Sequence, residues 1–194
     1  MGKTTRRDFM AYTAALASTT AGCGDSGGNG AAIVSDDLTR LSATEAVQAM
    51  RSGNLAAEDY ASALLARCRQ GGYLNAFRTL DAEQVLEAAR SADQRRASGA
   101  DTGLLHGLPI PVKDSVNTRD YPTSGGTRAL ENFYPSEDAE LVRRLTAAGA
   151  IVLGKTNIHE LSFGWTSNNY AFGPVRNPYN RERIPGGSSG GTAA

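Results

Sequence analysis

The sequence predicts an α/β fold, because stretches with helical periodicity alternate with short apolar runs typical of buried strands. Of its 194 residues, 40% are hydrophobic and 21% are charged, a composition suited to one packed domain. Basic and acidic residues number 20 each, so the formal net charge is zero. A nucleic-acid-binding domain ordinarily carries a basic excess, and we therefore expect no nucleic-acid partner.

Residues 1–23 are typical of a bacterial signal peptide. Arg6 and Arg7 precede a weakly apolar stretch, a pattern that resembles the twin-arginine export signal. The residues before Cys23 resemble a lipobox, although Thr20 stands where leucine is usual. We expect export to the periplasm or cell envelope, with Cys23 as a candidate lipidation residue and membrane tether. Simple cleavage without a lipid is the alternative.

Residues 24–38 begin with a glycine-rich run and are predicted to be a flexible linker. Residues 39–194 then form the predicted folded domain. A disulfide between Cys23 and Cys68 is disfavoured, because one lies in the signal segment and the other on a predicted amphipathic helix.

Three helices are expected early in the domain. Ser42 and Glu45 form a capping-box pattern that opens a helix running toward Ser52. Asp81 caps a third, more polar helix that continues to about Arg96. The apolar face of the second helix, between these two, consists of Tyr60, Leu64, Leu65 and Cys68.

Strands and one further helix follow the same logic. Residues 76–80 predict a short strand, and the two prolines in 108–113 favour an edge strand or a loop–strand junction. Residues 136–148 predict a helix, and 151–153 predict a buried strand. Residues 162–185, rich in glycine, asparagine and proline, are expected to be mostly loop.

Residues 149–156 match the phosphate-loop pattern G-x-x-x-x-G-K-T letter for letter. A phosphate loop needs its four variable residues in an open turn that points amides at phosphate. Here those residues are Ala-Ile-Val-Leu, which instead predict the strand itself. A nucleotide site is therefore disfavoured.

Residues 186–190 match G-x-S-x-G, the nucleophile elbow of α/β-hydrolases. That elbow requires an apolar strand immediately before it, and residues 177–185 cannot form one. Ser188 as a nucleophile stays an alternative, and so does a plain Gly/Ser linker. The latter is weakened by the apolar and aromatic residues on either side.

Lys113 ends the apolar segment that starts at Leu108. Partial desolvation there would lower the pKa of the amine and allow it to act as a base. A surface pair with Asp114, or a lysine that extends to solvent, is the alternative, and this segment alone favours the alternative.

Five motifs together resemble the amidase signature family over roughly residue 40 to the end. They occur in the family's order and approximate spacing. They are residues 107–114 (GLPIPVKD), 123–126 (TSGG), 154–157 (GKTN), 172–178 (FGPVRNP) and 185–191 (PGGSSGG). The resemblance implies an α/β/α fold with a mixed twisted sheet flanked by helices, incomplete in this chain.

The family uses a Ser–cis-Ser–Lys triad, and its motifs assign roles by position. Lys113 matches the lysine base, and Ser188 matches the bridging serine that follows a cis peptide bond. Ser189 matches a supporting hydrogen-bond donor, and the backbone near Ser162 would line the pocket for the substrate amide. The nucleophilic serine and the oxyanion hole are expected beyond Ala194, so this chain alone is expected to be inactive.

The resemblance implies hydrolysis of a small-molecule carboxylic amide, other than peptide bonds in general, through an acyl-serine intermediate. No cofactor or metal is expected, and His106 and His159 show no metal-ligand spacing. The family includes one component of a tRNA-dependent amidotransferase, but the export signal argues against that role. A non-catalytic exported lipoprotein that binds a small ligand is the rival hypothesis. The substrate and the oligomeric state stay open.

Overall fold

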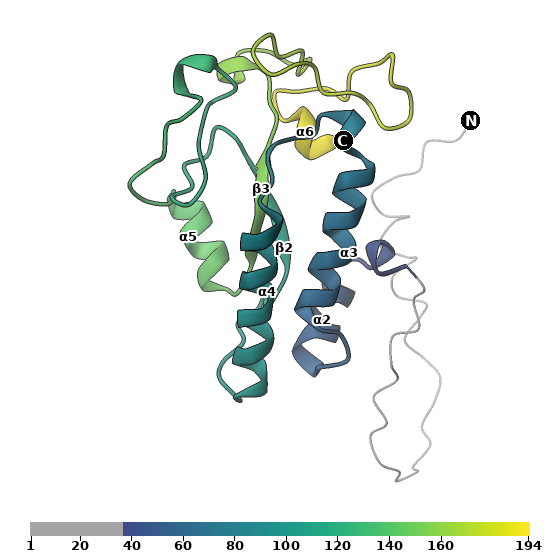
Figure 1. Ribbon diagram of the computed structural model, residues 1–194, viewed down its shortest axis with the longest axis vertical. Coiled ribbons are helices and arrows are strands. Elements are labelled where there is room, and N and C mark those ends of the chain that lie inside the picture. The colour runs from purple at the N-terminus through teal and green to yellow at the C-terminus, as the bar shows by residue number, and fades with distance from the viewer. Residues whose placement is uncertain (1–36) are drawn as a thin grey trace, which may run out of the picture. The chain divides into compact units, whose positions relative to one another are not determined.

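The computed structural model describes residues 37–194 (Figure 1). As predicted, the chain is an α/β protein, built around a three-stranded sheet with strand order β1-β3-β2. β1 (Phe77–Thr79) runs antiparallel to β3 (Ile151–Thr156), whereas β2 (Pro109–Lys113) runs parallel to it. The sheet is therefore mixed, with β3 in its centre.

The predicted signal peptide, Cys23 and most of the predicted linker lie outside the described residues. The last two linker residues, Asp37 and Leu38, are described and belong to the fold. Asp37 caps the 3-10 turn η1 (Leu38–Arg40), and Leu38 packs against the core. Within residues 37–194, no helix has the length and apolar character needed to cross a membrane.

α2 (Ala43–Ser52) begins with the predicted capping box. The Ser42 hydroxyl accepts a hydrogen bond from the Glu45 amide, and the Glu45 carboxylate accepts one from the Ser42 amide. Gly53 ends the helix with a φ of 80°, a left-handed conformation that favours glycine. Both ends of this helix are thus encoded within a dozen residues of sequence.

α3 (Ala57–Gln70) and α4 (Ala82–Ala97) are the second and third predicted helices. Asp81 is the N-cap of α4, and its side chain accepts a hydrogen bond from the Gln84 amide. α3 has no capping side chain next to it in sequence. Instead the Asp93 carboxylate of α4 accepts its first two amides, at 2.9 and 3.1 Å. This long-range cap joins the two helices.

The hydrophobic core lies between these three helices and the sheet, with α4 packed on both α3 and β3 (Figure 1). Met50, Leu65 and Val85 are fully or almost fully buried. Burying a side chain of this kind contributes about 1.5–3 kcal/mol. The core consists of Ala46, Val47, Ala49, Met50, Leu55, Ala57, Tyr60, Ala61, Leu65, Val85, Ala89, Leu108, Ile151 and Leu153.

α5 (Glu140–Ala147) starts four residues later than the expected Ser136, so the predicted start was wrong. The preceding residues are held outside the helix by two contacts to another loop. Asp138 accepts the Arg119 amide at 2.8 Å, and the Ala139 amide donates to the Asn117 carbonyl at 2.9 Å.

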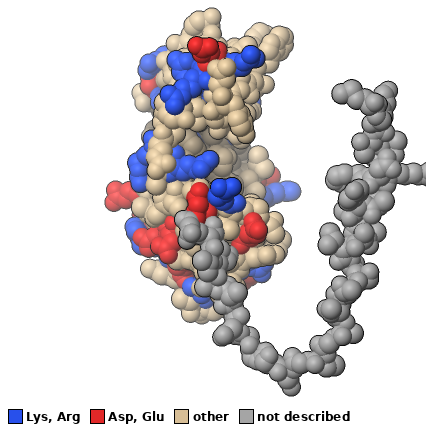
Figure 2. Space-filling view, turned by 90° about the vertical axis from the view of Figure 1, so that its right-hand side faces the viewer, with Lys and Arg blue, Asp and Glu red and all other residues tan. Residues whose placement is uncertain are grey.

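β3 includes residues 154–156 and is longer than the three residues expected. Most of the residues that match the phosphate-loop pattern, 151–156, are therefore in a strand, as the apolar pattern indicated. Beyond β3 the chain is mostly loop as far as the short helix α6 (Gly190–Ala193), interrupted by the 3-10 turn η4 (Glu160–Ser162). Figure 1 shows these loops gathered at one end of the sheet. Basic and acidic side chains are both present on the face seen in Figure 2.

Candidate functional site

Lys113 and Ser188, far apart in sequence, meet at the end of β2. The Lys113 ammonium donates a hydrogen bond of 2.7 Å to the Ser188 hydroxyl. The peptide bond between Gly187 and Ser188 is cis. Both side chains are half-buried, so the pair is shielded but reachable. The structure thus brings together the two residues that the sequence assigned to one proton path.

The expected alternative, a surface pair between Lys113 and Asp114, does not form. Asp114 follows the last residue of β2, and its side chain lies in the protein interior. Asp114 is 1% exposed, and its carboxylate lies 3.8 Å from the ammonium of Lys155. Lys113 is therefore left to contact Ser188.

Ser188 is held from two sides. The His159 amide donates to the Ser188 carbonyl at 3.0 Å, and the Gly191 amide donates to the Asn157 carbonyl at 2.9 Å. A side chain at Gly191 would collide with the Ala76 carbonyl, so only glycine permits this close approach.

α6 is anchored directly beside Lys113. Its Thr192 hydroxyl lies 2.9 Å from the hydroxyl of Thr156, the residue that pairs with Lys113 across the sheet. Residues 185–191, which include Ser188, are called the serine loop. This loop and Lys113 are therefore fixed to the same end of the sheet.

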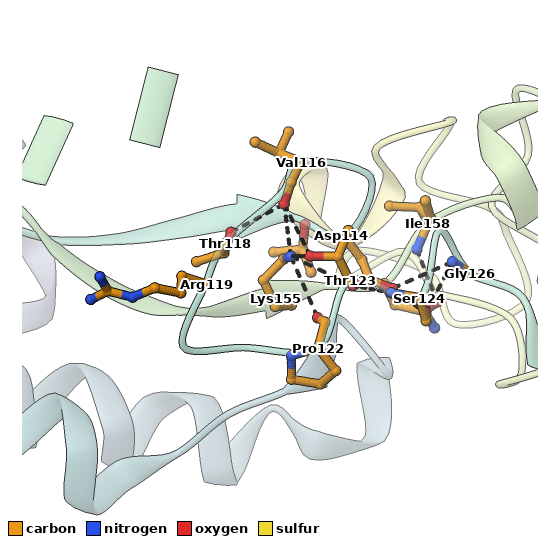
Figure 3. Close-up of polar contacts among 12 residues, drawn as sticks. Asp114, Val116, Thr118, Arg119, Pro122, Thr123, Ser124, Gly126, Lys155 and Ile158 are labelled. Carbon is orange, nitrogen blue, oxygen red and sulfur yellow. Dashed lines mark hydrogen bonds and ion pairs between the residues drawn. The ribbon is translucent and has the colours of Figure 1, made fainter. Parts of the chain in front are cut away.

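The polar contacts in Figure 3 include a second lysine, Lys155, to which the sequence alone assigned no role. Lys155 on β3 is 0% exposed and donates to the Thr123 hydroxyl at 2.7 Å and to the Val116 carbonyl at 2.8 Å. Burial lowers the pKa of Lys155 to about 8, while the charges of Asp114 and Asp138 act in the opposite direction. In the sequence, Lys155 stood in the phosphate-loop pattern and in the GKTN motif, but neither indicated its burial.

Asp114 organises the Thr123–Gly126 motif from inside (Figure 3). Its carboxylate accepts the amides of Ser124 and Gly126, at 3.2 and 3.3 Å, and also the Ser124 hydroxyl in a short hydrogen bond. The Gly125 carbonyl then accepts the Leu161 amide at 2.7 Å. A chain of hydrogen bonds therefore runs from the buried Lys155–Asp114 pair to the segment that contains Ser162.

Ser162, Ser188 and Ser189 were predicted to contact substrate, and these roles stay predictions. Ser162 has a φ of 58°, and its buried hydroxyl has no hydrogen-bond partner among residues 37–194. Ser189 precedes α6, and its carbonyl accepts the Thr192 amide at 3.1 Å.

Large apolar side chains are exposed on the loops that follow Ser162. Phe163 is 93% exposed, Trp165 81% and Tyr170 88%. Where such side chains form one contiguous patch, the surface typically binds a ligand or another protein segment.

The cysteine and the possible metal ligands of residues 37–194 were also considered as site residues. Cys68 is a free thiol, and burial raises its pKa. Residues 37–194 contain no group of three or more His, Cys, Asp or Glu side chains that could hold a metal ion.

Comparison with known proteins identifies the family. Residues 59–194 match the family described as Amidase. A component of the glutamyl-tRNA(Gln) amidotransferase of Cupriavidus pinatubonensis is 45% identical over 159 residues, which cover 82% of this chain and 31% of that protein. The corresponding component from Salinispora arenicola is 44% identical, with coverage of 81% and 32%. The chain belongs to the amidase signature family.

Solved structures agree. The peptide amidase from Stenotrophomonas maltophilia matches with a TM-score of 0.72 and 36% identity, over 78% of this chain and 33% of that one. A bacterial aryl acylamidase of the amidase signature family matches with a TM-score of 0.74 and 29% identity, over 78% and 32%. The chain thus spans about a third of the length of the relatives that it matches.

Proposed function

We propose that this chain supplies the proton relay of an amide hydrolase that works through an acyl-serine intermediate. The observation that carries the proposal is the 2.7 Å hydrogen bond between the Lys113 amine and the Ser188 hydroxyl. Family membership and the amidase neighbours support cleavage of a carbon–nitrogen bond in an amide. The substrate class is a small carboxylic amide.

In the first step, the Lys113 amine accepts the proton of the Ser188 hydroxyl, while Ser188 accepts one from the nucleophilic serine. That serine forms a bond to the amide carbon, and the carbonyl electron pair moves onto oxygen. Collapse of this tetrahedral species breaks the carbon–nitrogen bond, and the relay returns the proton to the leaving amine or ammonia. Water then attacks the acyl-serine by the same relay, which releases the carboxylic acid.

The nucleophile and the oxyanion hole are assigned to sequence following Ala194, as the resemblance implies. The relay needs that serine, because a relay without a nucleophile cannot form the acyl-enzyme. Ser162 and Ser189 are assigned to the surroundings of the substrate. The unpartnered hydroxyl of Ser162 supports this assignment.

Two observations on the full-length product of the gene test the proposal. The reading frame after the Ala194 codon should continue into a second Gly-Gly-Ser motif, and a stop codon there would rule out catalysis by this chain alone. A fluorophosphonate, which forms a covalent bond with activated serines, should label that later serine. Ammonia or amine release from simple amides should disappear with labelling.

A second candidate is a hydrolase in which Ser188 itself is the nucleophile and Lys113 its base. The same hydrogen bond favours it, because a serine beside an amine is an arrangement that can activate the hydroxyl. The labelling experiment separates the two: modification of Ser188 selects this candidate, and modification of a serine outside this chain selects the relay.

We also propose that the protein is exported, and that Cys23 tethers it to the membrane. Export would give it a role different from that of the amidotransferase relatives, whose name indicates a tRNA-linked substrate. Cell fractionation and mass spectrometry of the mature N-terminus test this. An unprocessed cytoplasmic protein would instead favour the amidotransferase role.

A further inference from the structure

Ser167 lies against the serine loop and has no place in the relay described above. It is 0% exposed. Its hydroxyl accepts a hydrogen bond from the Gly190 amide at 2.9 Å and donates to the Ser188 carbonyl at 3.4 Å. One side chain thus bridges the residue on the relay and the first residue of α6.

The glycines of the serine loop are shaped around this hydroxyl. A Cβ atom added at Gly187 would lie 2.6 Å from the Ser167 oxygen. One added at Gly190 would collide with the Ser167 side chain. The spacing of glycine in the Gly-Gly-Ser-Ser-Gly run therefore reflects close packing on Ser167 as well as the backbone turn.

Ser167 is itself firmly placed. Its φ is 52°, a left-handed conformation that is uncommon outside glycine. Its carbonyl accepts the Val175 amide at 3.0 Å. Such a conformation persists where surrounding contacts determine it, and these conformations cluster at functional sites.

We propose that Ser167 is a positioning residue that keeps the Ser188 hydroxyl within hydrogen-bond reach of Lys113. The inference rests on the proposed proton relay. Ser167 touches neither the lysine nor the reacting serine hydroxyl. It acts through the Ser188 carbonyl on one side and the Gly190 amide on the other.

The contacts that would survive its loss define the expected effect. Without the Ser167 hydroxyl, the buried Gly190 amide has no acceptor, whereas the Ser188 carbonyl keeps the His159 amide. The loop therefore stays attached at the Ser188 carbonyl and is expected to shift at Gly190. A displacement of about 1 Å in a catalytic group can lower the rate about 100-fold.

The test uses the full-length product of the gene with two variants, Ser167→Ala and Ser167→Gly. Both lack the hydroxyl, but glycine also removes the backbone strain at positive φ. Ser98→Ala is the matched control, because the Ser98 hydroxyl bonds the Arg95 carbonyl at an exposed helix end. kcat and KM for amide hydrolysis, thermal unfolding and crystal structures of the variants are measured.

We expect both variants to lose about 100-fold in kcat with KM changed by less than about twofold, since substrate contacts are not altered. Full kcat in both variants would overturn the inference. Recovery in Ser167→Gly alone would also overturn it, because backbone conformation would then be the role. Loss of cooperative unfolding in both would mark Ser167 as a folding residue and reject the positioning role.

If the unmodified protein hydrolyses no amide, the proposed function fails, and the crystal structures decide this inference separately. A separation of Lys113 Nζ and Ser188 Oγ beyond about 3.5 Å in Ser167→Ala supports positioning. A distance that stays at 2.7 Å overturns it.

Discussion

The helical base of this protein, α2 to α4 with the core beneath them, is built differently from its site loops, residues 114–126 and 157–189. The base is held by apolar burial and by caps such as Ser42. The site loops are held by buried polar groups such as Asp114 and Lys155, whose partners come from distant segments. Apolar packing tolerates adjustment, whereas a buried charge left without its partner is costly.

The largest expected effect comes from the buried ion pair beneath the site loops. Asp114→Ala leaves the Lys155 ammonium without its counter-charge and should lower the free energy of unfolding by about 3–5 kcal/mol. Urea denaturation measures this. The control is Asp120→Ala, whose carboxylate pairs with Arg119 at the surface and should change stability by less than about 0.5 kcal/mol. Equal losses of unfolding free energy in Asp114→Ala and Asp120→Ala would contradict the claim that the buried pair stabilises the fold more than the exposed pair.

A core truncation in the helical base should come next. Leu65 is 1% exposed, and Leu65→Ala should lower the free energy of unfolding by about 2–4 kcal/mol, from lost burial plus the cavity left behind. Leu141→Ala, at a position 58% exposed, is the control and should stay within about 0.5 kcal/mol. The comparison predicts that KM of the full-length protein is unchanged in Leu65→Ala, because Leu65 lies on α3, outside the site loops.

The pH dependence of stability should carry the signature of Lys155. Its pKa is about 8 in the fold and about 10.4 when unfolded, so between these values the unfolded chain binds more protons. Lys155 should therefore contribute a rise in stability of about 1 kcal/mol from pH 8 to pH 9, which the raised pKa of the half-buried Cys68 thiol partly offsets in the same window.

Lys155→Met should abolish that rise, which denaturant titrations at several pH values can detect. The window stays below pH 10 because burial raises the pKa of Tyr121 to about 12, and this acts in the opposite direction above pH 10. An unchanged rise in Lys155→Met would assign it to another group.

The smallest effect is expected at the helix cap. Ser42→Ala removes one half of the capping box and should lower the free energy of unfolding by about 1 kcal/mol. Thermal unfolding beside Ser98→Ala, which removes an exposed hydroxyl that does not cap a helix N-terminus, measures it. A loss of unfolding free energy as large as that of Asp114→Ala would contradict the expectation that each cap in the helical base contributes only a small, local stabilisation.

The same contrast explains what could be predicted from the sequence. The helix starts at Ser42 and Asp81 were predictable because capping signals act within a few residues. The start of α5 was misplaced because contacts of Asp138 and Ala139 with a distant loop override local propensity.

At the site, motif resemblance brought Lys113 and Ser188 together, which periodicity alone could not do. The burial of Lys155 and the packing of Ser167 against the serine loop were missed. Each depends on atoms from segments tens of residues away. Such contacts leave no local pattern.

The proposed catalysis depends on Lys113 acting as the base of a proton relay through Ser188. It is tested most directly by kcat for amide hydrolysis by the full-length product of the gene, in its natural form and as Lys113→Ala, with Ser98→Ala as the control. We predict a loss of about 10,000-fold or more in Lys113→Ala, with no comparable change in the control. Full activity in Lys113→Ala would show that Lys113 is not the base.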